Sequence, residues 1–200
     1  MKQGHPNTRQ SVCIVGHGPS LQGRSLGVEI DKYDIVIRMI NCAWQDKVDY
    51  GTKHDISIHC PTQPQFKDDP QMPDFGYFIY YPTGWDKHLL VPNVTFRRKP
   101  SFGDDAWLAE LHGEEKPFSR GAAAALLATR FFYVGTLCFA GTVKLCSDLN
   151  EKYPDHHPSL LELSHPYKGR TDTHNWENEA RTLQDTTDRQ NIKLEFLECS

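Results

Sequence analysis

The chain has 200 residues, of which 38% are hydrophobic and 24% charged, and its formal net charge is -4 at pH 7. A chain of this length fits one domain that buries roughly two-thirds of its unfolded surface, and the acidic balance excludes a global basic field for nucleic acid or an anionic membrane. No stretch reaches the ~18 apolar residues that a membrane helix needs, so we expect a cytoplasmic protein with no membrane span.

The first predicted element is a buried strand that opens into a glycine turn. Residues 11–16 are mostly apolar, and Gly16-His17-Gly18-Pro19 continues the chain. Small residues after a strand let backbone N–H groups approach a phosphate or ribose without a Cβ in the way. The turn lacks the third glycine of the dinucleotide fingerprint, so a purely structural turn stays open beside a nucleotide site.

A second strand is predicted over residues 35–39, after an apolar segment and an acid-rich turn. This connection is too long for a hairpin, which favours a parallel pair joined by a short helix or a loop. Residues 54–59 and 76–81 are further short strand candidates. We interpret residues 10–60 as the nucleotide-binding half of a single domain that spans residues 1–200.

Residues 82–117 show no regular spacing of apolar residues and contain many proline, glycine and charged residues. Such a segment is long for a structureless connection. We interpret it as a lid or acceptor loop, and the alternative is a helix around residues 105–112 that merely covers the sheet.

The strongest helix signal lies in residues 122–130, which are rich in alanine and leucine, and Ser119 is placed to cap this helix. A strand is predicted next, over residues 134–141. No acid caps the helix in the sequence. We therefore expect its N–H groups to receive an anionic group from a ligand.

The last third of the chain carries its densest run of reactive side chains. Residues 164–179 contain two histidines, a tyrosine and three acids, which is typical of a site. A helix is predicted over residues 174–189, and residues 191–197 alternate apolar and charged side chains as an edge strand does. We interpret residues 117–200 as the catalytic half of the domain.

Six cysteines are widely spaced and include no Cys-x-x-Cys pair. Buried, reduced thiols are the expected state.

Four segments in this order resemble the motifs of the sialyltransferases, glycosyltransferase families 29 and 42. The first motif resembles residues 13–21 and 27–41, and the second resembles Pro117-Phe118-Ser119-Arg120-Gly121. A histidine-aromatic element is similar to His165-Pro166-Tyr167, and a His-x-x-x-x-Glu element is similar to the run from His174 to Glu179. Together the four segments are spread along the chain from residue 13 to residue 179.

The resemblance implies an α/β fold: a single Rossmann-like domain of the GT-A-like kind, with a mostly parallel central sheet flanked by helices. It also implies an inverting glycosyltransferase that moves sialic acid or a related sugar from a nucleotide-sugar donor, typically a CMP-sugar. The acceptor would be a hydroxyl group of a glycan or another molecule. No cofactor and no divalent metal are expected.

The resemblance also assigns roles to residues. His174 stands at the position of the base, and a neutral imidazole near pH 7 suits that role. His165 and Tyr167 would meet the charge on the leaving phosphate. Arg38 and Glu179 are expected to support the site. The candidate donor-binding residues come from both halves of the chain and are Gly16, His17, Gly18, Ser20, Asn41, Ser119, Arg120 and Gly121.

The sequence departs from the family pattern at several positions. His17 stands where family 29 members usually carry asparagine, and Arg120-Gly121 replaces a hydroxyl residue and a glycine. Val12 stands where secretory-pathway members carry a cysteine that is bonded to a second one, and residues 121–132 contain no cysteine. The resemblance therefore points to a bacterial or phage member rather than a Golgi enzyme.

Three other functions stay open on the sequence. A metal-dependent hydrolase could use His174 and Glu177, at i and i+3 on a helix, with His165 as third ligand. A non-catalytic module could bind a nucleotide or a partner without a reaction. A glycosyltransferase could also act on a modified nucleic-acid base, which the net charge neither demands nor forbids.

Overall fold

A computed structural model describes residues 8–16, 19–39, 46–59, 76–79, 110–111, 118–141 and 176–197. Within these ranges six strands form one sheet of order β4-β3-β2-β1-β5-β6, and every neighbouring pair is parallel. The strands are β1 (Gln10–Val15), β2 (Ile35–Met39), β3 (Ile56–His59), β4 (Gly76–Ile79), β5 (Val134–Ala140) and β6 (Lys193–Phe196). The α/β fold expected from the sequence is therefore confirmed.

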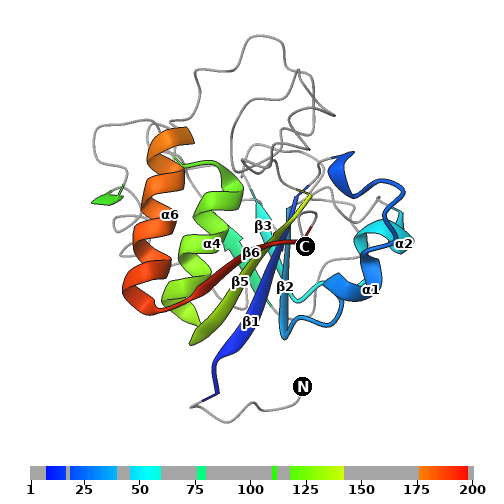
Figure 1. Cartoon of the computed structure of the whole chain (residues 1–200), viewed down its shortest axis with the longest axis horizontal. Helices are drawn as coiled ribbons and strands as arrows, with labels where there is room; N and C mark the ends of the chain where they lie inside the picture. The colour runs from blue at the N-terminus through cyan, green and yellow to red at the C-terminus, as the bar shows by residue number, and fades with distance from the viewer. Residues whose placement is uncertain are drawn as a thin grey trace, which may run out of the picture.

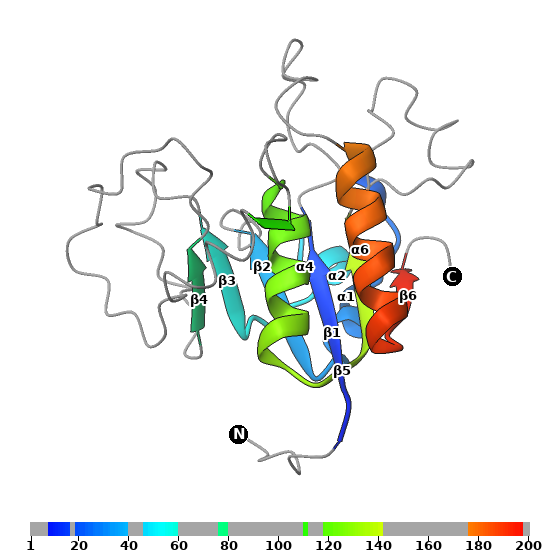
Figure 2. The same ribbon diagram turned by 90° about the vertical axis from the view of Figure 1, so that its left-hand side faces the viewer.

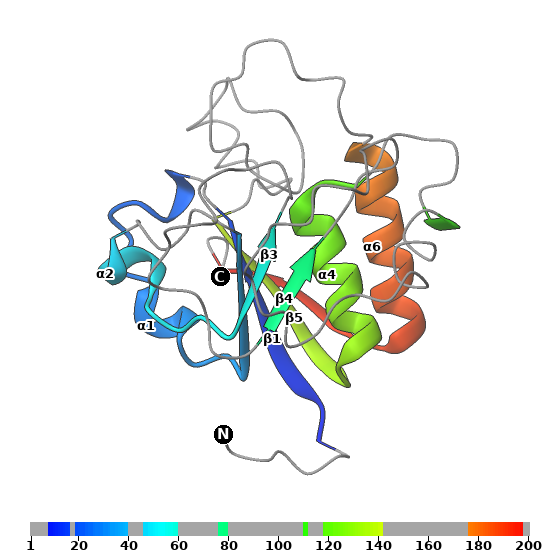
Figure 3. The same ribbon diagram turned by 180° about the vertical axis from the view of Figure 1, so that it is seen from behind.

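Helices lie on both faces of this sheet (Figures 1 and 2). The helices α4 (Arg120–Phe131) and α6 (Trp176–Gln190) cover one face, while the one-turn helices α1 (Gly27–Ile30) and α2 (Lys47–Tyr50) and the 3-10 turn η1 (Pro19–Leu21) lie on the other. The view from behind shows the same separation (Figure 3). No helix among the described residues is long and apolar enough to cross a membrane.

The central strand β1 is buried on both faces, which explains its nearly continuous apolar sequence. Val12 and Ile14 pack in the core under α4, whereas Cys13 and Val15 pack on the opposite face. The alanines of residues 122–125 in α4 are 0% exposed, so this helix lies close against the sheet. Cys13 and Cys138 are buried and take part in no disulfide bond, as expected, and the other four cysteines lie outside the described residues.

The backbones of α1 and α2 lie very close together at Gly27. A Cβ placed on Gly27 would lie 2.3 Å from the carbonyl oxygen of Lys47 and 2.5 Å from the backbone nitrogen of Gly51. Gly51 has a φ of 75° and faces the carboxylate of Asp31, which accepts hydrogen bonds from the N–H groups of Thr52 and Lys53. The helix α2 was not predicted from the sequence, because a four-residue helix has too few residues to show a helical period.

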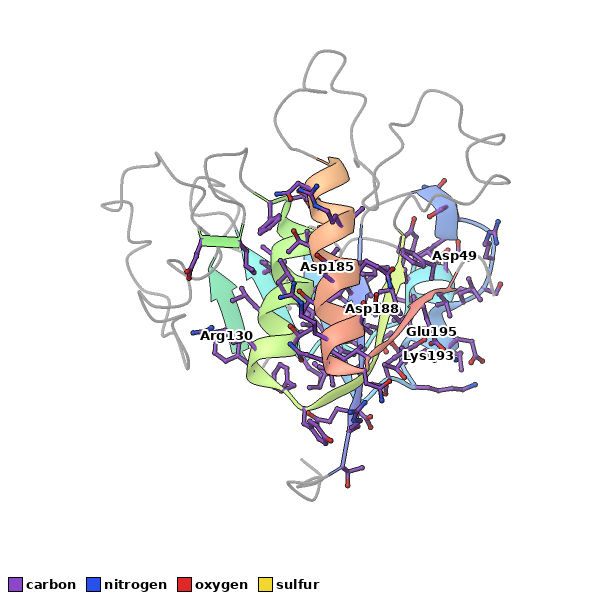
Figure 4. The ribbon with its side chains drawn as sticks, turned by 60° about the vertical axis from the view of Figure 1, so that its left-hand side comes forward. Asp49, Arg130, Asp185, Asp188, Lys193 and Glu195 are labelled. Carbon is purple, nitrogen blue, oxygen red and sulfur yellow. The ribbon has the colours of Figure 1, made fainter. Side chains whose placement is uncertain are left out.

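The predicted strands match the observed ones within two residues at each end. β6 lies at the edge of the sheet, as its alternation predicted. Lys193 and Glu195 of this strand form an ion pair of 2.5 Å, and Figure 4 shows both on β6, beside α6 with Asp185 and Asp188. Charged side chains of this kind discourage a further strand from pairing with the edge. The predicted lid at 82–117 lies outside the described residues except for residues 110–111.

Candidate active site at the carboxyl edge of the sheet

The strand order changes direction between β1 and β5. The chain runs outward from β1 through β2 and β3 to β4, and then returns to place β5 and β6 on the other side of β1. In open parallel sheets, ligands bind beyond the carboxyl ends of the strands at such a switch point. Figure 2 shows that α4 and α6 begin at this same edge of the sheet.

Gly16 and Gly141 meet at the switch point. The N–H group of Gly16, which follows β1, donates a hydrogen bond of 2.7 Å to the carbonyl oxygen of Ala140, the last residue of β5. Gly141 has a φ of 66°, and a Cβ on it would lie 3.0 Å from the carbonyl oxygen of Gly16. The two chain segments therefore touch where the glycine turn begins.

Ser119 and Glu179 join the starts of α4 and α6. Glu179 is 1% exposed. Its Oε1 accepts a hydrogen bond from the Ser119 N–H, and its Oε2 lies 2.9 Å from the Ser119 hydroxyl. The Ser119 oxygen also accepts a bond of 3.3 Å from the N–H of Ala122, so Ser119 caps α4 as predicted. The Glu179 carboxyl group of α6 thus holds Ser119, the residue that caps α4.

This contact corrects one expectation. The sequence near Ser119 carries no acid that could cap α4, which led to the expectation that a ligand supplies the anionic group. Glu179 brings a carboxyl group there from 60 residues further along the chain. The statement that only a ligand could supply an anionic group was wrong, because it counted only acids near Ser119 in sequence, whereas packing of α6 on α4 supplies one from another element.

Burial raises the pKa of Glu179 from its ordinary value of 4.5 to about 7, although the two hydrogen bonds from Ser119 act in the opposite direction. A buried carboxylate loses its hydration, so the charged form is disfavoured. Near neutral pH this group exists in both protonation states.

Stability should therefore depend on the ionisation of Glu179. The pKa of Glu179 is higher in the folded than in the unfolded protein. The stability that Glu179 contributes is therefore fully present below a pH of about 4.5 and is lost as the pH rises through about 7. We expect the unfolding free energy of the wild type, relative to Glu179→Gln, to fall by on the order of 3 kcal/mol between pH 4.5 and 8. Urea unfolding of both proteins at several pH values measures this. A constant difference would show that Glu179 does not titrate in this range.

Arg38 is buried near the carboxyl end of β2. Its Nε donates a bond of 2.7 Å to the carbonyl oxygen of Lys53, and Nη2 donates one of 2.8 Å to that of Tyr50. Nη2 is also 3.8 Å from Asp31 Oδ1. The guanidinium thus joins the end of β2 to α2 and the segment after it. Asn41, two residues past β2, lies outside the described residues.

The segment after the glycine turn is held by a residue that the sequence analysis missed. The Asp49 carboxylate of α2 accepts hydrogen bonds from the N–H groups of Gly23, at 2.6 Å, and Ser25, at 2.8 Å. These bonds, led by that of Gly23, lower the pKa of Asp49. Ser20 is buried in η1 between this segment and the turn. Asp49 and Gly141 carried no recognisable motif, although a glycine directly after an apolar strand is a usable signal for Gly141.

The other predicted site residues divide into two groups. Arg120 and Gly121 form the first turn of α4, next to Ser119. Six predicted site residues lie outside the described residues, and they are His17, Gly18, Asn41, His165, Tyr167 and His174. In the described part of the chain, no three His, Cys, Asp or Glu side chains are grouped so that they could hold a metal ion.

Solved structures of sialyltransferases share this fold. A mammalian sialyltransferase is 14% identical, matches with a TM-score of 0.58, and aligns over 93% of this chain and 68% of its own. The monofunctional α-2,3-sialyltransferase Cst-I from Campylobacter jejuni is 14% identical, with a TM-score of 0.60 over 98% of this chain and 79% of its own.

The sialyltransferase CstII from Campylobacter jejuni, solved with cytidine-5'-monophosphate as a substrate analogue, is 15% identical and has a TM-score of 0.55. That match covers 96% of this chain and 81% of CstII. No curated protein sequence matches the chain significantly.

A family model supplies the remaining evidence. The model described as glycosyltransferase family 29 (sialyltransferase) matches residues 2–119, which is more than half of the chain. This range contains the glycine turn, Arg38 and Ser119. The chain therefore belongs to glycosyltransferase family 29, the sialyltransferases.

Proposed function

We propose that this glycosyltransferase moves sialic acid or a related sugar from a CMP-sugar to an acceptor hydroxyl, with inversion and without a metal ion. The observation that carries the proposal is the arrangement at the carboxyl edge. Gly16, which follows β1, and the Ser119 end of α4 belong to segments that resemble two family motifs, and both lie at the same edge of one parallel sheet. The CMP complex of CstII, a protein of the same fold, supports CMP as the nucleotide.

The donor is held by backbone and small polar groups in this proposal. Gly16, His17 and Gly18 let main-chain N–H groups approach the nucleotide. Arg120 and Gly121 are the first two residues of α4, and N–H groups in the first turn of a helix have no partner within it. These donors, with His165 and Tyr167, meet the charge of the departing phosphate without a divalent ion.

The acceptor is activated by His174. Its imidazole takes the proton of the acceptor hydroxyl as the oxygen attacks the anomeric carbon, and the bond to the CMP phosphate oxygen breaks on the opposite face. The acceptor is a glycan or another hydroxyl compound. A mammalian sialyltransferase of this fold was solved with Gal-beta-1-3GalNAc-ortho-nitrophenol, which supports a glycan.

A nucleotide screen tests the proposal. Melting temperatures are measured with CMP, UMP, GMP and AMP, each with and without EDTA, and CMP-sialic acid is then tried as donor with galactose-terminated acceptors. The proposal requires selective stabilisation by CMP that survives EDTA. A metal-dependent response would favour the hydrolase alternative, and no response to any nucleotide would contradict a donor site at this edge.

Gly141 offers a structure-based test of where the nucleotide binds. Gly141→Ala places a side chain at positive φ and 3.0 Å from the Gly16 carbonyl oxygen, so the glycine turn must shift. We expect the Kd for CMP to rise about tenfold, or ~1.4 kcal/mol.

Gly135→Ala is the matched control, because Gly135 lies near the opposite end of β5, where an added Cβ meets Arg9 Cβ at 2.7 Å. This variant should lose stability and keep its CMP affinity. Calorimetric titration with CMP measures the affinity of both variants. Equal losses of affinity in Gly141→Ala and Gly135→Ala would contradict a nucleotide site beside Gly141.

A further inference from the structure

The contact between Glu179 and Ser119 has two distinct hydrogen-bonded states. When Glu179 is ionised, it only accepts, so its Oε1 takes the Ser119 N–H and its Oε2 takes the Ser119 hydroxyl proton. The single hydroxyl proton of Ser119 is then committed to the protein. The Ser119 oxygen still accepts from the Ala122 N–H.

Protonation of Glu179 reverses one of these bonds. A proton on Oε2 is donated to the Ser119 oxygen, which has lone pairs for this donor and for the Ala122 N–H. The Ser119 hydroxyl proton is released and can be donated to an oxygen of a ligand. The negative charge beside the first turn of α4 disappears at the same time. Both changes favour an anionic ligand.

The elements around Glu179 carry charged side chains of their own. On α6, Arg181 is exposed and donates to Asn178, at 2.9 Å. On α4, Arg130 is in the last turn, and Figure 4 shows it at the far end of that helix. From the sheet, Arg38 bonds to Tyr50 and Lys53, on the α1 and α2 side. Burial raises the pKa of Glu179 to about 7, and the two Ser119 bonds offset only part of this increase.

We infer that Glu179 is a positioning residue that couples donor binding to proton uptake: its neutral carboxyl group favours the nucleotide phosphate, and its carboxylate opposes it. The inference rests on the proposed function, since it takes the CMP moiety to bind beside Ser119. The proton comes from the solvent and stays on Glu179 Oε2, and the Ser119 hydroxyl proton turns from Glu179 toward the ligand. Donor affinity should therefore fall as pH rises through neutrality.

Glu179→Gln imitates the protonated state. The amide oxygen can accept from the Ser119 N–H, and the amide NH2 can donate to the Ser119 oxygen, as a protonated carboxyl does. CMP affinity is measured by calorimetry at pH 6 and pH 8 for the wild type and for this variant. The variant also corrects for the titration of CMP, because the second pKa of a phosphate monoester lies near 6.

Between pH 6 and pH 8, we expect the Kd for CMP to rise by a factor that is about ten times larger for the wild type than for Glu179→Gln. At pH 8 the variant should therefore bind CMP more tightly than the wild type does. Calorimetry of the wild type at pH 7.5 in two buffers of different ionisation enthalpy should show proton uptake on binding. This second measurement needs no variant.

Four results would count against the inference. Parallel pH dependences, or binding by the wild type without proton uptake, would overturn it and leave the proposed function intact. Weaker binding by Glu179→Gln at every pH would make the residue merely structural. If the wild type bound no CMP at any pH, the proposed function would be overturned, and this inference with it.

Discussion

Replacement of His174 by alanine is expected to lower kcat by about 10²–10⁴-fold, because a positioned general base contributes a factor of this size. The acceptor hydroxyl would have to lose its proton to water. The Kd for CMP should stay within about tenfold of the wild-type value, since a base acts mainly in the transition state. Initial rates with CMP-sialic acid and calorimetric titration with CMP measure the two quantities.

His157→Ala is the matched control for this experiment. His157 belongs to the polar stretch of residues 147–158, which contributes no predicted site residue. Its replacement should leave both kcat and Kd unchanged. If His174→Ala lost rate and CMP affinity in equal measure, His174 would hold the site together rather than accept a proton.

Gly27→Ala is expected to destabilise the fold by about 2–4 kcal/mol, as overpacking against rigid neighbours does. A Cβ there would lie 2.3 Å from the Lys47 carbonyl oxygen and 2.7 Å from that of Val48, both of which are backbone atoms of α2. No side chain can rotate away to make room. The helices α1 and α2 must therefore separate, and α2 carries Asp49, which holds the segment after the glycine turn.

Urea unfolding of the variant measures this loss. Gly23→Ala is the control, because Gly23 also lies on this side of the sheet and has a φ of 73°, but a Cβ on it meets no atom within 4 Å. It should cost only the backbone strain, about 1–2 kcal/mol. A Gly27→Ala protein as stable as the Gly23→Ala protein would show that α1 and α2 shift apart at little cost.

The strands and the two long helices could be predicted because their signals are local. An apolar run bounded by turn residues predicted β1, the alanine-rich segment after Ser119 predicted α4, and alternation predicted β6 at an edge. Each signal depends on residues within a few positions of one another. The one-turn helix α2 was missed because four residues are too few for a period, although Asp46, which accepts from the Val48 N–H, is a local N-cap signal.

The sequence by itself thus determined the class of fold and the family, since each depends on the order of residues along the chain. Only the tertiary structure decided which distant groups meet. Glu179 reaches Ser119, Asp49 reaches Gly23, and Gly141 touches Gly16, and each pair is joined by packing of separate elements. No local pattern specifies such a contact, because burial and hydrogen bonding select the partner after the sheet and helices have assembled.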